Sequence, residues 1–317
     1  MNTKQYFEQF ILESKIDASK RTGVLELVGM GFTSFPTIPS SLIRLDCSSN
    51  QLTSLPPLPN TLKVLHCSGN KLTSLPALPK SLTELYCSEN QLTSLPDLPL
   101  SLTKLRCSSN QLTSLPTLPP VLTEFYCYNS QLTTLPILPA TLTALSCCKN
   151  QLASLPALPS MLTMLICSHN PLHSLPALPS SLIVLDCSYN HLTILPPLPD
   201  SLTEMDCSYN RLTSLPAFPD SFQQLRCYCE SPNPFFVKLI RENIGGWIDL
   251  NTIRVVERYY EKIRQKLRNM LALRQTLGTS YNSYIDEDCL NVVGSYLSGY
   301  TGSLATQVTE LKLSLRT

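Results

Sequence analysis

The chain has 317 residues and 13 cysteines, and its 24 lysines and arginines nearly balance its 23 aspartates and glutamates. Because the formal net charge is only +1, a general electrostatic attraction to nucleic acid or to a membrane surface is not expected. The N-terminal stretch carries Glu8 and Glu13 and has no long apolar run, so neither a secretory signal nor a transmembrane span is expected.

The N-terminal residues have the pattern of a short amphipathic helix. In residues 2–16, apolar side chains recur at roughly helical spacing with charged residues between them. These are Tyr6, Phe7, Phe10, Ile11 and Ile16. We interpret residues 1–20 as a helical cap that covers the first unit of the repeat array that follows.

Residues 21–230 repeat one pattern in steps of 20 residues. Two successive copies read SLIRLDCSSNQLTSLPPLPN and TLKVLHCSGNKLTSLPALPK. The fixed positions of the first are Leu42, Leu45, Cys47, Asn50, Leu52, Leu55, Pro56, Leu58 and Pro59. A fixed period of about 20–29 residues with this leucine and asparagine spacing indicates a leucine-rich repeat solenoid. The sequence predicts about ten such repeats and a strand fragment at residues 221–229.

Each part of the repeat has a physical role. A five-residue strand around Leu45 and Cys47 would point both side chains into the core, and successive copies would stack as parallel strands roughly 4.8 Å apart. This predicts a parallel sheet on the concave face. Asn50 would turn the chain and bind backbone groups of the next coil, which predicts an asparagine ladder. Ser130 replaces one ladder asparagine, so that turn is expected to be irregular. The Leu-Pro-x-Leu-Pro segment predicts an extended, polyproline-like convex side.

Ten of the thirteen cysteines occupy the inward core position, at Cys47 and every twentieth residue to Cys227. Free cysteine is a small, often buried hydrophobe, so we interpret this row as reduced, structural leucine substitutes in a reducing, intracellular compartment. A metal-binding row is the alternative, but parallel side chains cannot surround an ion tetrahedrally. No metal or cofactor is therefore expected. Cys148 is expected to face outward and to be modified first.

After Cys229 the period stops, and residues 231–317 are predicted to form an α-helical cap and tail. Asn233 and Pro234 suit a helix start, and Gly245-Gly246 suits its end. A second amphipathic helix is predicted from apolar side chains at i, i+3 and i+4 spacing. These are Ile253, Val256, Tyr260, Ile263, Leu267 and Met270. Its basic side suits either a membrane surface or, as we interpret it, solvent.

The 20-residue repeat that ends in Leu-Pro-x-Leu-Pro resembles the short bacterial-type leucine-rich repeats of the YopM/IpaH effector group. Its Cys-Ser-x-Asn variant is also similar to repeats encoded by giant viruses. The resemblance implies an effector-like protein that binds other proteins, with the host cytoplasm as its site of action. Some effectors of this group carry a ubiquitin-ligase domain with a Cys-x-Asp active site. No cysteine here begins such a triplet, so that activity is not expected.

The segment Ile285–Leu297, IDEDCLNVVGSYL, is similar to the opening of an F-box. The matching positions are Leu290, Val293, Tyr296 and Leu297. This resemblance implies an alternative role as the substrate adaptor of a ubiquitin ligase. The other interpretation, which we favour, is an amphipathic helix that folds back on the basic helix before it.

The sequence contains no coherent catalytic motif. Its four histidines, His66, His169, His173 and His191, fall in different coils. A glycine-rich phosphate loop, a His-Glu-x-x-His pair and a nucleophile elbow are all absent from the sequence. The sequence therefore predicts a non-catalytic scaffold.

Outward strand positions, aligned by the repeat, identify a candidate partner-binding face. Lys104 is flanked by Glu84 and Glu124, and Arg106 is flanked by Tyr86 and Tyr126. We therefore expect the charges of this region to be paired with one another. Its role could be either structural or in binding.

Farther along the sheet, adjacent like charges are expected to cost stability. The residues concerned there are Asp186, Asp206 and Glu204, beside an exposed apolar step at Met164 and Ile166 and the strand-exit residues Tyr189 and Tyr209. We interpret coils six to nine, residues 141–220, as the docking site of a basic, partly apolar protein segment. A merely solvated acidic edge is the alternative.

Overall fold

The fold is a stack of short coils, each contributing one strand to a single sheet. The structure is a computed structural model that describes residues 14–35, 38–212, 215–216, 218–227 and 248–249. The strands are β1 (Val24–Glu26), β2 (Arg44–Asp46), β3 (Val64–His66), β4 (Glu84–Tyr86), β5 (Lys104–Arg106), β6 (Glu124–Tyr126), β7 (Ala144–Ser146), β8 (Met164–Ile166), β9 (Val184–Asp186), β10 (Glu204–Asp206), β11 (Gln224–Arg226) and β12 (Ile248–Asp249).

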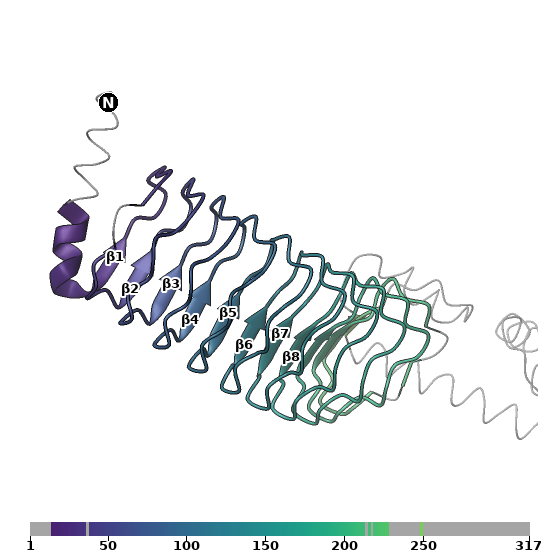
Figure 1. The fold of residues 1–317 in the computed structure, drawn as a ribbon. Coiled ribbons are helices and arrows are strands. Elements are labelled where there is room, and N and C mark those ends of the chain that lie inside the picture. Colours follow the sequence, from purple (N-terminus) through teal and green to yellow (C-terminus); the bar gives the residue numbers. More distant parts are fainter. Residues whose placement is uncertain (1–13, 36–37, 213–214, 217, 228–247, 250–317) are drawn as a thin grey trace, which may run out of the picture.

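The strands pair in chain order, and β1 to β11 are parallel. Each residue is paired with the residue 20 positions away, as in Leu25 with Leu45. Among the strands that the structure describes, β12 alone runs antiparallel, against β11. Figure 1 shows the successive coils side by side, with their strands along one face of a curved rod. The leucine-rich repeat solenoid expected from the 20-residue period is confirmed.

Strands β1 to β11 have three residues each, fewer than the five expected. Cys47 lies just past β2, yet it is fully buried and its N–H still donates to the carbonyl of His66 at 2.8 Å. Two residues later, Ser49 adopts a left-handed backbone with φ 58°. This conformation is not that of an extended strand, so the regular strand ends early, although the Ser49 N–H still donates to Ser68 O at 2.8 Å.

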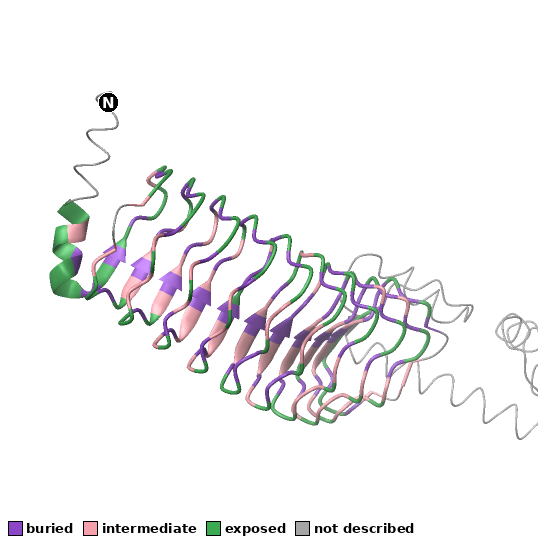
Figure 2. Ribbon diagram, viewed as in Figure 1, coloured by how far each residue is buried: buried purple, intermediate pink, exposed green. Residues whose placement is uncertain are grey.

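The core is a column of leucines and cysteines between the sheet and the convex side. In each coil from β2 to β10 the middle strand residue is buried, whereas the first strand residue is only partly covered. Figure 2 shows this buried stripe along the coils. The return segments, such as residues 51–59, contain neither helix nor strand. Leu52 and Leu55 of this segment are buried, and Leu58 is partly buried against the core.

The asparagine ladder is confirmed, but its direction is opposite to the one expected. The Asn50 amide donates to Leu27 O at 2.6 Å and Cys47 O at 2.9 Å, and its oxygen accepts from Phe32 N at 3.0 Å. It therefore joins its own coil to the preceding coil rather than to the next one. The bonds are equivalent from Asn70 to Asn210, except at Ser130.

At Ser130 the expected irregular backbone is not found. Asn129 keeps a left-handed backbone with φ 55°, like the equivalent residue in the other coils. The difference lies in the hydrogen bonds, because the Ser130 hydroxyl is buried without a partner. A serine side chain is too short to reach the preceding coil, whereas the stacked neighbours still impose the turn.

A helix over residues 14–22 precedes β1. It continues past Ile16, the last apolar residue of the pattern found in the sequence, and Ile16 packs against the core. The helix ends at Gly23, whose N–H donates to Ser19 O at 2.7 Å and whose φ is +70°. Glycine adopts this conformation without steric cost, so it terminates the helix. Within the described part of the chain, no helix has the length and apolar character needed to cross a membrane.

Candidate functional site

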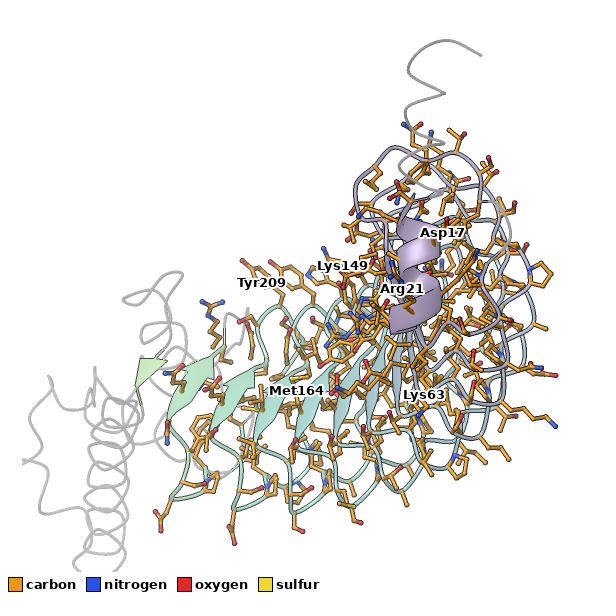
Figure 3. All side chains as sticks on the ribbon, turned by 90° about the vertical axis from the view of Figure 1, so that its left-hand side faces the viewer. Asp17, Arg21, Lys63, Lys149, Met164 and Tyr209 are labelled. Carbon is orange, nitrogen blue, oxygen red and sulfur yellow. The ribbon has the colours of Figure 1, made fainter. Side chains whose placement is uncertain are left out.

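The strand register brings the predicted concave-face residues into contact across neighbouring strands. Asp186 is the register partner of Asp206 and of Ile166, and Glu204 is the partner of Val184. Figure 3 shows Met164 against the middle of the sheet and Tyr209 along the edge where the strands exit. The structure thus places the candidate residues of β8 to β10 on one continuous surface.

From β4 to β6 the charged side chains are paired with one another. Lys104 Nζ lies 3.9 Å from Glu84 and 3.4 Å from Glu124, and these carboxylates raise the pKa of the lysine, Glu124 the more strongly. The Arg106 guanidinium lies 5.3 Å from the centroid of Tyr86 and 4.7 Å from that of Tyr126. This region is internally satisfied, as the sequence predicted.

The same network extends to β2 through His66. The Nδ1 atom of His66 lies 3.3 Å from the Asp46 carboxylate, and its ring lies 4.1 Å from the Tyr86 ring. The Nε2 atom is buried without a hydrogen-bond partner. Burial lowers the pKa of His66 although Asp46 opposes the shift, so the neutral imidazole is favoured.

The apolar part of the face lies across β7 to β9. Its strand positions are Ala144, Ser146, Met164, Ile166 and Val184. Met164 and Ile166 are half-buried rather than exposed, which corrects the expected exposed step. Close stacking of neighbouring strands covers their flanks. A partner would therefore meet a shallow apolar surface rather than protruding side chains.

Asp186 is held in one orientation by hydrogen bonds from two adjacent coils. Its Oδ2 atom accepts from the Ser168 hydroxyl at 2.8 Å. Its Oδ1 atom accepts from the Ser188 hydroxyl at 2.7 Å and from the Ser188 N–H at 3.0 Å. These bonds offset part of the cost that the sequence pattern assigned to the adjacent carboxylates.

Asp206 is in a less favourable environment. Its Oδ1 atom accepts from the Ser208 N–H at 2.9 Å. Burial raises the pKa of Asp206, the hydrogen bonds from Ser208 lower it, and the charge of Asp186 raises it further. The net shift is upward, which means that the ionised form is destabilised in the folded protein. Arg226, the register partner of Asp206, opposes this shift without cancelling it, and a second cation from outside would oppose it further.

Tyr189 and Tyr209 belong to an exposed aromatic stack at the strand exits. The rings of His169 and Tyr189 lie 4.1 Å apart, and those of Tyr189 and Tyr209 lie 4.2 Å apart. The two tyrosines are 44% and 47% exposed. All three residues have positive φ angles, between 52° and 54°, a region that bulky side chains rarely occupy.

Three residues of this surface were missed in the sequence analysis. His169 completes the aromatic stack, and Ser168 and Ser188 orient Asp186. The signal was present in the repeat register, since His169, Tyr189 and Tyr209 are spaced 20 residues apart. His169, Ser168 and Ser188 follow the strands, so the outward positions within the strands do not include them.

The ladder cysteines are buried, and those from Cys47 to Cys187 are free thiols. Burial raises the pKa of the Cys47 and Cys87 thiols to about 12, so they stay protonated at neutral pH. Cys148 is half-buried, and burial raises the pKa of its thiol too. In the part of the chain that the structure describes, no group of three or more His, Cys, Asp or Glu side chains could hold a metal ion.

The predicted C-terminal helices and the adaptor segment lie outside the described residues. This includes Leu290, Val293, Tyr296 and Leu297. The adaptor role and the boundary of the C-terminal region therefore stay predictions from the sequence.

Comparisons with known proteins agree with this architecture. A family model described as "Leucine Rich repeats (2 copies)" matches residues 40–80. Among solved structures, the chain is similar to YopM from Yersinia enterocolitica WA-314, with 41% identity and a TM-score of 0.61, over 62% of this chain and 44% of that one. The chain thus spans less than half of that protein's length. None of the curated proteins matches the chain.

Two further solved structures are similar. YopM from Yersinia pestis, described as a leucine-rich effector protein, is 32% identical with a TM-score of 0.60, over 71% of this chain and 80% of that one. The functional domain of InlJ from Listeria monocytogenes is 27% identical with a TM-score of 0.52, over 65% of this chain and 53% of that one. Its description states that it includes a cysteine ladder, the same device that fills the core here.

Proposed function

The chain belongs to the leucine-rich repeat family, and we propose that it is a non-catalytic scaffold that binds a partner protein on its concave sheet face. Solenoids of stacked repeats present an extended concave surface of this kind for binding. The proposed binding region lies across β7 to β10. The partner segment is proposed to be basic and partly apolar.

The observation that carries this proposal is the contrast between two parts of the concave face. From β4 to β6, Lys104 and Arg106 are paired with Glu84 and Glu124. From β7 to β11, the strand residues include three acids, Asp186, Glu204 and Asp206, and one base, Arg226. This excess of negative charge lies next to the apolar surface of Met164 and Ile166. A basic and apolar segment would complement both features.

The test uses two labelled ten-residue peptides, one of alternating lysine and leucine and one of alternating glutamate and leucine. Fluorescence anisotropy with the full chain should show binding of the lysine peptide only. The double variant Asp186→Asn, Asp206→Asn should weaken that binding at least about tenfold, because two charge-assisted contacts are lost. Asp97→Asn is the matched control, since Asp97 is exposed in a return segment away from the strands.

Equal binding of both peptides, or equal weakening by Asp97→Asn, would contradict the proposed surface. Cross-linking of the bound lysine peptide followed by mass spectrometry gives a second readout. Cross-links should concentrate on residues 141–220. Cross-links confined to another part of the chain would place the binding site elsewhere.

The adaptor role is a separate proposal that rests on the sequence of Ile285–Leu297 alone. It is tested by deleting residues 280–317 and comparing the proteins that the full and shortened chains capture. Loss of ubiquitin-ligase subunits with retention of the lysine peptide would support an adaptor tail. Unchanged capture would leave the concave-face scaffold as the whole function.

A further inference from the structure

The chain itself shows how this sheet face accommodates a guanidinium group. Arg106 lies over the rings of Tyr86 and Tyr126, and its Nη2 atom is 3.4 Å from a Glu124 carboxylate oxygen. A planar guanidinium suits such a setting because its faces contact aromatic rings while its edge donates hydrogen bonds to carboxylates. The aromatic and acidic residues come from neighbouring strands.

The same kinds of side chain recur at β9 and β10. Each of these strands ends in an aspartate, Asp186 or Asp206, and each is followed three residues later by an exposed tyrosine, Tyr189 or Tyr209. Asp186 has Ile166 and Asp206 as its register partners, so neither neighbour in its row carries a positive charge. The two carboxylates lie on adjacent strands, which are about 4.8 Å apart.

The Asp186 carboxylate is also held in one orientation, with acceptor positions left for a ligand. Ser168 and Ser188, both buried, fix its orientation with three hydrogen bonds. A carboxylate has about four acceptor positions, and its Oδ2 atom has accepted only one of these bonds. A fixed acceptor therefore stands beside Asp206, at the border of the apolar surface.

We propose that the anchor of the partner segment is an arginine, whose guanidinium bridges Asp186 and Asp206 and packs beside Ile166 and the edge of the Tyr189 ring, whose two faces are covered by His169 and Tyr209. This inference rests on the proposed function and specifies the residue that the surface recognises. An arginine has several N–H donors in one plane, so it can donate to both carboxylates at once.

Lysine has the same charge but meets this surface less well. Its ammonium group is strongly hydrated, whereas guanidinium is planar and weakly hydrated and can lie against apolar groups. The apolar neighbour Ile166 and the half-buried strand positions of β8 and β9 require the cation to lose water. This loss costs less free energy for guanidinium, so the surface should favour arginine.

The experiment compares three labelled ten-residue peptides that alternate leucine with arginine, lysine or citrulline. Citrulline keeps the shape of arginine without its charge. Anisotropy titrations with the full chain should show that the arginine peptide binds at least about fivefold more tightly than the lysine peptide, and that the citrulline peptide binds most weakly.

Two variants test which residues cause the preference for arginine over lysine. Asp186→Asn and Tyr189→Leu should each reduce the ratio of arginine to lysine affinity toward one. Tyr128→Leu is the matched control, because Tyr128 is also exposed beside the sheet, three coils away, and it should leave the ratio unchanged. Circular dichroism of each variant shows whether the solenoid remains folded.

The outcomes separate the two proposals. Equal affinity for the arginine and lysine peptides, with both weakened by Asp186→Asn, would overturn the arginine anchor and leave the basic-segment surface intact. A preference for arginine that Asp186→Asn does not change would place the anchor elsewhere and overturn it as well. If none of the peptides binds, both proposals fail.

Discussion

The rings of Tyr189 and Tyr209 stack with 4.2 Å between their centroids and 19° between their planes, although both residues adopt left-handed backbone conformations. The equivalent position in another coil is Gly69, which adopts this conformation without strain. Aromatic residues at this position therefore carry a backbone cost. Stacking between the rings offsets part of it.

Glycine substitutions separate the backbone cost from the stacking. Glu89→Gly should stabilise the fold by about 0.5–1 kcal/mol, since Glu89 has a φ of 54° and glycine relieves the strain. Tyr189→Gly relieves the same strain but removes contacts with two rings, so its gain should be smaller or reversed. Urea unfolding of both variants checks this order. An equal gain would show that the stack contributes no stability.

The missing ladder asparagine offers a second test. Ser130→Asn should stabilise the fold by about 1–2 kcal/mol, because it removes a buried, unpaired hydroxyl and supplies an amide to the preceding coil. The matched opposite change is Asn110→Ser. It removes bonds to Cys87 O and Cys107 O, each 3.0 Å, and should destabilise by a similar amount or more. Thermal unfolding followed by circular dichroism measures both, and a loss of stability in Ser130→Asn would refute the explanation given for this coil.

The sequence was sufficient to predict every strand of the array because the period dominates. Leu45 and Cys47 can reach the core only if each coil repeats the same path, and stacking enforces that path even where Ser130 breaks the ladder. Local conformations were harder to predict. The left-handed residue before each ladder asparagine is imposed by the coil geometry, since residues such as Glu89 and Tyr189 do not favour it.

The candidate site was predicted only in part for a related reason. Register alone placed Asp186 beside Asp206, because a parallel sheet with constant repeats allows no other neighbour. The hydrogen bonds from Ser168 and Ser188 depend on side-chain rotamers, which the period does not specify. The exposure of the Met164 side chain was overestimated, because the extent to which adjacent strands cover it depends on the spacing of those strands.

The cysteine ladder should contribute through packing alone. Cys107→Ala should destabilise the fold by about 1–2 kcal/mol, somewhat less than truncation of a buried leucine, because the Cys107 side chain is fully buried. Burial raises the pKa of its thiol, so it stays protonated and unreactive. Unfolding curves with and without reductant should coincide. Unfolding caused by reductant alone would show that disulfides, rather than packing, hold the array.

The two aspartates of the proposed binding surface should differ in their effect on stability. Asp206→Asn should stabilise the fold slightly at pH 7, because burial and Asp186 destabilise its ionised form. Asp186→Ala should destabilise it by about 1–3 kcal/mol, since the buried hydroxyls of Ser168 and Ser188 lose their acceptor. Any gain in stability from replacing both aspartates should therefore come from Asp206 alone. Urea unfolding of each single variant gives the comparison.

The effect of Asp206 should also depend on pH. Its pKa is raised in the folded protein above the ordinary value of 3.8, so the folded state binds more protons than the unfolded state in the window just above pH 3.8. The wild type should therefore lose stability relative to Asp206→Asn as the pH rises through the raised pKa, and the difference should disappear below pH 3.8. A difference that instead grows as the pH falls would mean that the Asp206 carboxylate is stabilised in the fold. The charge of Asp206 would then already be compensated within the chain, and a basic partner would gain less from binding to the concave face.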